Sequence, residues 1–133
     1  MQSAPKSNGL MYVEAKLNGK PMKVMVDTGA THNVITPEEA KRVSLWVTQP
    51  QGGWLKTVNA PAKPLNGVAT EVELCLGTWK GTLGLIVAPM DDFDVVFGMD
   101  FLRKAKAFLM PCYDSMYIME KGLACTIPAT SND

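Results

Sequence analysis

Strand-sized runs of alternating residues constrain this chain more than any other feature. Val68 to Leu76 places an apolar or β-branched residue at every second position, and turn residues follow at Gly77. A period of two over such a length predicts a strand with one buried face. Runs of this kind recur along the chain, whereas helical patterns are few and short. We therefore expect a mainly β fold with one or two short helices.

A hairpin is predicted near the N-terminus. Leu10–Leu17 and Pro21–Asp27 flank Asn18-Gly19, the dipeptide favoured in two-residue hairpin turns. Further strands are expected at residues 33–35, 54–58, 82–88, 94–97, 107–110 and 116–119. Loops or turns are expected at residues 49–53, 59–64, 77–81 and 111–115.

Two short helices are expected. Thr36 is placed to cap the first, Pro37 suits its first position, and Glu39 would complete a capping box, with the helix ending near Val43. Residues 98–104 suit the second. The predicted organisation is a flexible lead at 1–9, one domain at 10–121 and a tail at 122–133, disordered from residue 128.

Composition excludes several classes of protein. The chain has 133 residues, 47% of them hydrophobic, and a formal net charge of zero. That length suits one domain, and neither a nucleic-acid-binding patch nor a span of roughly 20 apolar residues is visible. An odd number of cysteines (Cys75, Cys112, Cys125) favours a reducing, cytoplasmic setting. A zinc site joining them to His32 is a disfavoured alternative, because no pair has the close spacing of zinc ligands.

The chemistry-bearing motif is Asp27-Thr28-Gly29. A carboxylate stands at the end of an apolar strand, a hydroxyl follows it, and glycine permits a tight turn and close approach of another chain. Taken alone, this tripeptide is more often a simple strand-ending turn. Its context favours a function.

The run Val-Met-Val-Asp-Thr-Gly-Ala-Thr-His-Asn-Val-Ile at 24–35 resembles the active-site loop of aspartic proteases. Asp-Val-Val-Phe-Gly-Met-Asp-Phe-Leu at 94–102 resembles the apolar-apolar-Gly segment and helix late in retropepsin-like domains, at that family's spacing. The likeness runs from about residue 10 to 120. It is closest to proteases of LTR retrotransposon polyproteins of the Ty3/gypsy kind, particularly plant ones. It implies a closed β-barrel-type fold acting as a C2 homodimer.

The resemblance also implies roles. Asp27 would be catalytic, and since no second Asp-Thr/Ser-Gly occurs, the partner carboxylate would come from a second chain. Two close carboxylates share one proton and activate water, so neither metal nor cofactor is expected. Thr28 would bond its counterpart across the two-fold axis, and Gly29 would contact the substrate backbone. The implied activity is polypeptide cleavage, processing a Gag-Pol polyprotein.

The rest of the cleft follows from the same resemblance. Ala30, Thr31 and His32 would line it, although His32 could equally satisfy only local hydrogen bonds. Val58, Asn59 and Ala60 would form the flap tip, where this sequence departs from the glycine-rich flap of retroviral enzymes. Residues 107–110 and 116–119 are the candidates for the dimer base.

Two readings compete with an enzyme. A domesticated or inactive copy of the fold would serve as a homodimeric binding module, which the intact Asp27-Thr28-Gly29 argues against. A purely structural β-domain in a capsid-like assembly would leave the carboxylate at the strand end unexplained.

Overall fold

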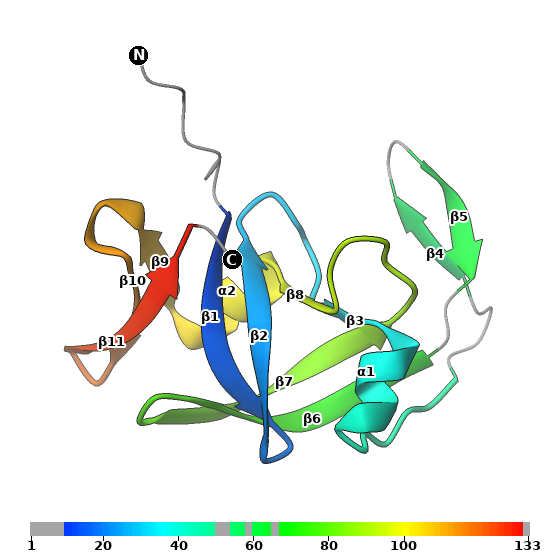
Figure 1. The fold of residues 1–133 in the computed structure, drawn as a ribbon, viewed down its shortest axis with the longest axis horizontal. Helices are drawn as coiled ribbons and strands as arrows, with labels where there is room; N and C mark the ends of the chain where they lie inside the picture. Colours follow the sequence, from blue (N-terminus) through cyan, green and yellow to red (C-terminus); the bar gives the residue numbers. More distant parts are fainter. Residues whose placement is uncertain (1–9, 50–53, 58–59, 65–66, 132–133) are drawn as a thin grey trace.

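Within the residues that the structure describes, 10–49, 54–57, 60–64 and 67–131, six strands close into a barrel (Figure 1). This structure is a computed structural model. The ring closes because β1 pairs with both β2 and β6. Its order is β1 (Leu10–Leu17), β2 (Lys20–Asp27), β8 (Val95–Phe97), β3 (Val34–Ile35), β7 (Trp79–Val87) and β6 (Gly67–Leu76). The expected mainly β, closed-barrel fold is confirmed.

The β1–β2 hairpin forms as its turn residues predict. Asn18 and Gly19 both have positive φ, 53° and 83°, the backbone that a two-residue hairpin turn of the I′ type requires. The register runs without a slip from Leu17 opposite Lys20 to Leu10 opposite Asp27. Odd-numbered residues of β1 are buried from Met11 onward, so alternation places one face of the strand in the core. The hairpin therefore sets where Asp27 emerges.

Strands β9 (Ala107–Met110), β10 (Ser115–Glu120) and β11 (Leu123–Thr130) continue the sheet beyond β1. β9 and β10 form the expected hairpin, joined by the 3₁₀ turn η1 (Pro111–Tyr113). The predicted disorder from residue 128 is wrong as far as Thr130, because β11 pairs with β10 and, at its end, with β1. The sequence did not predict this strand because apolar and polar residues alternate only weakly along it. Only Ile127 and Ala129 of the strand are buried. The domain boundaries stay a prediction.

Helix α1 (Pro37–Arg42) begins and ends where expected, and Thr36 Oγ1 accepts from Glu39 N at 3.3 Å. The capping box is only half formed. Thr36 N donates to Asp94 O instead, and the Glu39 carboxylate binds Arg42, whose pKa it raises by hydrogen bonding.

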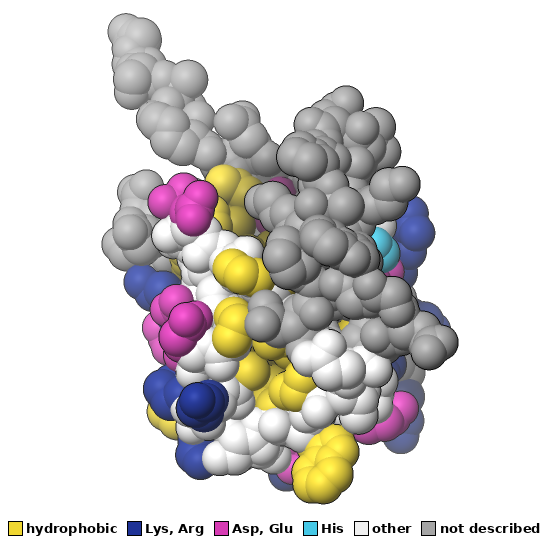
Figure 2. All heavy atoms as spheres, turned by 90° about the vertical axis from the view of Figure 1, so that its right-hand side faces the viewer, with side chains coloured by type: hydrophobic (Ala, Val, Ile, Leu, Met, Phe, Trp, Pro, Cys, Tyr) yellow, Lys and Arg dark blue, Asp and Glu magenta, His cyan; other side chains and the backbone are white. Residues whose placement is uncertain are grey.

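On the face of the molecule that carries α1, hydrophobic side chains form a band with acidic and basic side chains along its margins (Figure 2).

A separate two-stranded sheet rises beside the barrel, made of β4 (Trp54–Thr57) and β5 (Ala60–Pro64) (Figure 1). The first strand was expected. The second was expected to be a loop because of its prolines, yet it pairs with β4 through a register shift between Leu55 and Thr57. An irregular two-stranded ribbon leaves an outer edge that donates no ladder bonds, which is where proline is tolerated.

The core fills the barrel and extends under α2 (Met99–Ala105). The ring centroids of Phe97 and Phe101 lie 4.8 Å apart, and the rings of Phe101 and Trp79 are nearly perpendicular with centroids 6.4 Å apart. Both phenylalanines are almost completely buried. This aromatic cluster fixes α2 against β8 and β7, close to the end of β2.

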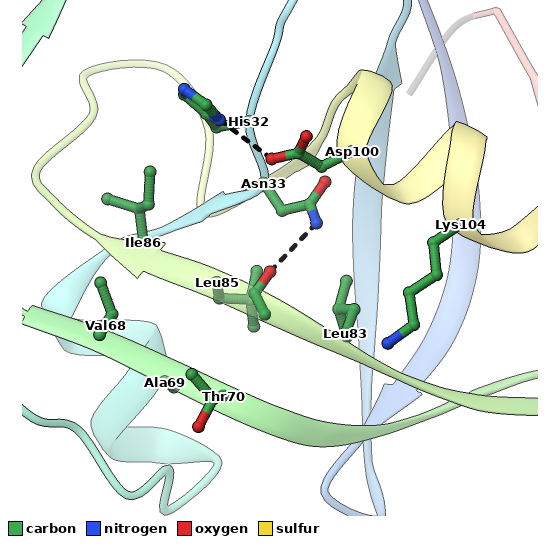
Figure 3. A pocket seen from close by; sticks show the side chains of 11 residues that line it. His32, Asn33, Val68, Ala69, Thr70, Leu83, Leu85, Ile86, Asp100 and Lys104 are labelled. Atoms are coloured by element: carbon green, nitrogen blue, oxygen red, sulfur yellow. Dashed lines mark hydrogen bonds and ion pairs between the residues drawn. The ribbon is translucent and has the colours of Figure 1, made fainter.

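A buried amide joins three of these elements. Asn33, 4% exposed, lies just before β3 and accepts at Oδ1 from Gly98 N at 2.9 Å and from Phe101 N at 3.3 Å. Its Nδ2 donates to Gly84 O on β7 at 3.0 Å (Figure 3). Both polar atoms of this side chain have partners, as a buried polar group requires.

We predict that Ile127→Ala lowers the free energy of unfolding by about 2–5 kcal/mol, because truncating a buried aliphatic side chain leaves a cavity. Ile127 is 2% exposed. The matched control is Thr126→Ala on the exposed face of the same strand, expected to change stability by less than about 0.5 kcal/mol. Urea unfolding measures both. Equal, small effects would show that β11 does not contribute to the folded core.

We also predict that Asn33→Ala destabilises the domain by roughly 1–3 kcal/mol for each buried partner left without a bond. Three backbone groups lose their partner, on Gly84, Gly98 and Phe101. Hydrogen exchange should report fastest opening at the start of α2. Unchanged protection there, in a variant with wild-type stability, would contradict this role for the amide.

Candidate active site

Asp27 ends β2 at the mouth of the barrel. Its neighbour Val26 pairs with Phe97 of β8 and is fully buried, while Asp27 itself is only partly buried. The carboxylate accepts at Oδ1 from Gly29 N at 2.8 Å, and Ala30 N donates to Asp27 O at 3.1 Å. The turn after the strand therefore orients the carboxylate, and no hydrogen bond from the described residues reaches its other oxygen. Such a group can bind water or a second carboxylate.

The two sequence motifs meet in space. Gly98 precedes α2 at a point where the loop after Asp27 crosses it, and a Cβ on Gly98 would lie 2.6 Å from Ala30 O and 2.7 Å from His32 O. Real Cβ atoms essentially never come so close to a backbone oxygen, so only glycine fits without movement. The glycine of the second motif is thus required by the backbone of the first.

The loop also caps α2. The first four N–H groups of a helix have no partner within the helix. Here Met99 N donates to Ala30 O at 2.8 Å and Asp100 N to Thr31 O at 3.0 Å. The other two N–H groups, of Gly98 and Phe101, both donate to Asn33 Oδ1. Gly98 has no side chain to cap the helix, and the active-site loop takes over that function.

The structure brings most of the predicted site residues into one loop. Thr28, Gly29, Thr31 and His32 are exposed, and Ala30 is partly buried. Ala60 begins β5 in the separate ribbon, and Val58 and Asn59 lie outside the described residues. The loop therefore exposes several of these residues directly after Asp27, while Ala60, the described residue of the predicted flap, belongs to another element.

Two neighbours of the loop were missed. Asn33 is the first of them, although an amide followed by Val34-Ile35 signals a polar group entering the core. Asp100 was not singled out, yet its Oδ2 lies 3.0 Å from His32 Nδ1, with both side chains about half exposed (Figure 3). The local hydrogen bond considered for His32 is therefore present. Its partner could not be found from sequence because the two residues lie far apart along the chain.

Among the described residues, no group of three or more His, Cys, Asp or Glu side chains is placed to hold a metal ion. Cys75, Cys112 and Cys125 are free thiols. In the same part of the chain, no helix is long and apolar enough to cross a membrane.

Comparison with known proteins gives a family. A family model described as "gag-polyprotein putative aspartyl protease" matches residues 13–104. DNA damage-inducible protein 1 of Phaeosphaeria nodorum is 26% identical over 100 residues, which is 74% of this chain. The chain spans only 22% of that relative's length.

Solved structures share the fold. The retroviral protease-like domain of Ddi1 from Leishmania major superposes with a TM-score of 0.74 at 18% identity, covering 93% of this chain and 97% of that one. A retropepsin-like aspartic protease from Rickettsia conorii gives 0.57 at 22% identity, with 95% and 88% covered. EIAV protease, complexed with the inhibitor HBY-793, gives 0.59 at 21%, with 74% and 90% covered. Since the family model covers well over half of the sequence and the barrel is that of retropepsins, this chain belongs to the gag-polyprotein aspartyl protease family and has the retropepsin-like fold.

Proposed function

We propose that this protein is an aspartic endopeptidase whose active site forms between two copies of the chain. The observation that carries the proposal is the placement of Asp27. Its carboxylate is partly exposed at a barrel mouth and oriented by Gly29 N, in a loop anchored by the N–H groups of Gly98 and of the first three residues of α2. Rigid positioning of a carboxylate beside open space is what general acid–base chemistry on a bound water requires.

The proposed chemistry uses a pair of carboxylates. When two Asp27 side chains approach, like charge prevents both from ionising, and they hold one proton between them. The ionised member takes a proton from water as that water attacks the peptide carbonyl, and the protonated member donates to the carbonyl oxygen. Thr28 is proposed to bond its counterpart in the second chain. Gly29, Ala30, Thr31 and His32 are proposed to contact the substrate, with Val58, Asn59 and Ala60 over it.

A homodimer is proposed because the sequence contains one Asp-Thr-Gly. A two-fold axis is the simplest symmetry that brings two copies of one residue together. The candidate base is the outer face of β9 and β10, where Phe108 is 45% exposed and stacks on Tyr117 at 5.4 Å. Met119 is 39% exposed on the same hairpin. Exposed apolar side chains clustered in this way are typical of protein interfaces.

Two classes of substrate are candidates for the proposed peptidase. The family description supports a Gag-type polyprotein as the substrate. The residues of the two motifs, which resemble Ty3/gypsy proteases, support the same substrate. The similarity to DNA damage-inducible protein 1 favours a second candidate function. In that function, the protein would cleave or bind a protein other than a retroviral-type polyprotein. Incubation with a Gag-Pol-type polyprotein and with an unrelated unfolded protein separates the two, since only a polyprotein protease should yield a few discrete fragments from the former.

We predict that Asp27→Asn lowers the rate of peptide cleavage by at least about 10²–10⁴-fold, because an amide can neither activate water nor hold the shared proton. Cleavage of a mixed peptide library, followed by mass spectrometry, gives the rate. Circular dichroism should be unchanged. The matched control is Asp114→Asn, an exposed aspartate in the turn before β10, which should cleave like wild type. A folded, fully active Asp27→Asn protein would refute the proposal.

We further predict that activity depends on self-association. Specific activity should fall on dilution below the dimer dissociation constant, where the rate approaches the square of protein concentration. Asp27→Asn chains mixed with wild type should inhibit beyond simple dilution, because each mixed dimer has one carboxylate. Analytical ultracentrifugation gives the dimer fraction in parallel. Cleavage proportional to protein concentration in a sample that sediments as a monomer would disprove the two-chain site.

A further inference from the structure

A groove lies beside the active-site loop on the outer side of the barrel, between α2 and the sheet of β6 and β7 (Figure 3). Its volume is about 320 Å³, near the low end of the roughly 300–1,000 Å³ typical of ligand sites. His32 and Asp100 close one end, and Lys104 reaches down from α2 at the other. The groove is therefore continuous with the loop that carries Asp27 but extends away from it.

The floor is open because of Gly84. In β7, Leu83 and Leu85 are buried in the core, so alternation directs Thr82, Gly84 and Ile86 outward. A Cβ on Gly84 would meet only Ala69 O, at 3.7 Å, an ordinary contact, and its φ is not positive. The fold does not need glycine here, unlike at Gly98. Glycine inside a strand weakens it and often marks close approach of a ligand or another backbone.

The walls combine apolar surface with positive charge. Val68 of β6 and Ile86 of β7 are directly paired across the strands and only partly buried, so they offer aliphatic surface. Asp100 has His32 as its partner. Lys104 Nζ donates only to the neutral Thr82 hydroxyl, at 3.1 Å, among the interactions of the described residues. Among the described residues the ammonium makes no ion pair, and the nearest acid on its helix face, Asp100 one turn earlier, is paired with His32.

We propose that this groove is an exosite that binds an aliphatic and acidic segment of the polypeptide substrate, outside the residues that flank the cleaved bond. An aliphatic side chain would lie over Gly84 between Val68 and Ile86, and a carboxylate would reach Lys104. The inference rests on the proposed peptidase function. Because Asp100 and His32 join the groove to the active-site loop, a segment bound here is held close to Asp27, which raises its local concentration at the cleft.

The test measures binding without turnover. Full-length Asp27→Asn protein is used to select from a displayed library of random ten-residue peptides, and the enriched peptides are then measured by fluorescence anisotropy. We expect enrichment of aliphatic residues next to Glu or Asp. Affinity should fall at least roughly tenfold, the effect of about 1.4 kcal/mol, when Gly84→Val fills the floor or when Lys104→Glu reverses the charge.

Arg103→Glu is the matched control. It makes the same change of charge one residue earlier on α2, where the side chain is exposed and does not line the groove, and it should retain binding. Gly84→Val should melt no lower than the parent. If it fails to fold, the comparison of Lys104→Glu with Arg103→Glu decides alone.

Three outcomes overturn the exosite: no enriched class, enrichment of basic peptides, or equal losses in Lys104→Glu and Arg103→Glu. Each of these outcomes can occur while the wild-type protein still cleaves peptides, and in that case only the exosite proposal is refuted. Conversely, if peptides bind the groove but the wild-type protein cleaves none, the peptidase function is refuted and the groove remains a binding site for acidic peptides.

Discussion

Capping of α2 by the loop that follows Asp27 (residues 28–33) is the interaction on which the placement of Asp27 depends. Gly98 and Phe101 at the start of α2 are buried, and buried N–H groups at a helix N-terminus need acceptors from the protein. The carbonyls of Ala30 and Thr31 and the amide of Asn33 supply those acceptors. The same bonds hold the loop rigid, so the helix is stabilised and the Asp27 carboxylate is positioned by one set of contacts.

In that arrangement, most of the contacts that position Asp27 come from its own chain. The carbonyls of Ala30 and Thr31 and the amide of Asn33 find their partners at the start of α2, where Phe97 and Phe101 pack together. The Asp27 carboxylate stays partly exposed and has one backbone donor, so a single chain avoids the cost of a buried, unpaired charge. In the proposed homodimer, association would bring the second carboxylate beside it, and proton sharing would relieve the repulsion.

Two glycines illustrate opposite physical reasons for the same residue. At Gly98 a side chain would collide with two backbone oxygens, so packing of the loop demands glycine. At Gly84 a side chain would fit, and the strand would gain from it. The first glycine serves the fold. The second leaves a surface open beside the loop that follows Asp27. Stability does not account for this glycine, whereas binding at that surface would.

Local sequence was sufficient for the elements whose signals are local. Alternation and the Asn18-Gly19 turn predicted the first hairpin, Thr36-Pro37 the start of α1, and Asp27-Thr28-Gly29 a carboxylate presented by a tight turn. Tertiary structure decided what depends on distant partners. It made a strand of β11, whose few buried residues show no strong pattern, and it moved the second half of the Thr36 capping box to Asp94. It also assigned Asn33, His32 and Asp100 their partners, because a hydrogen bond across some 65 residues leaves no periodicity in the chain.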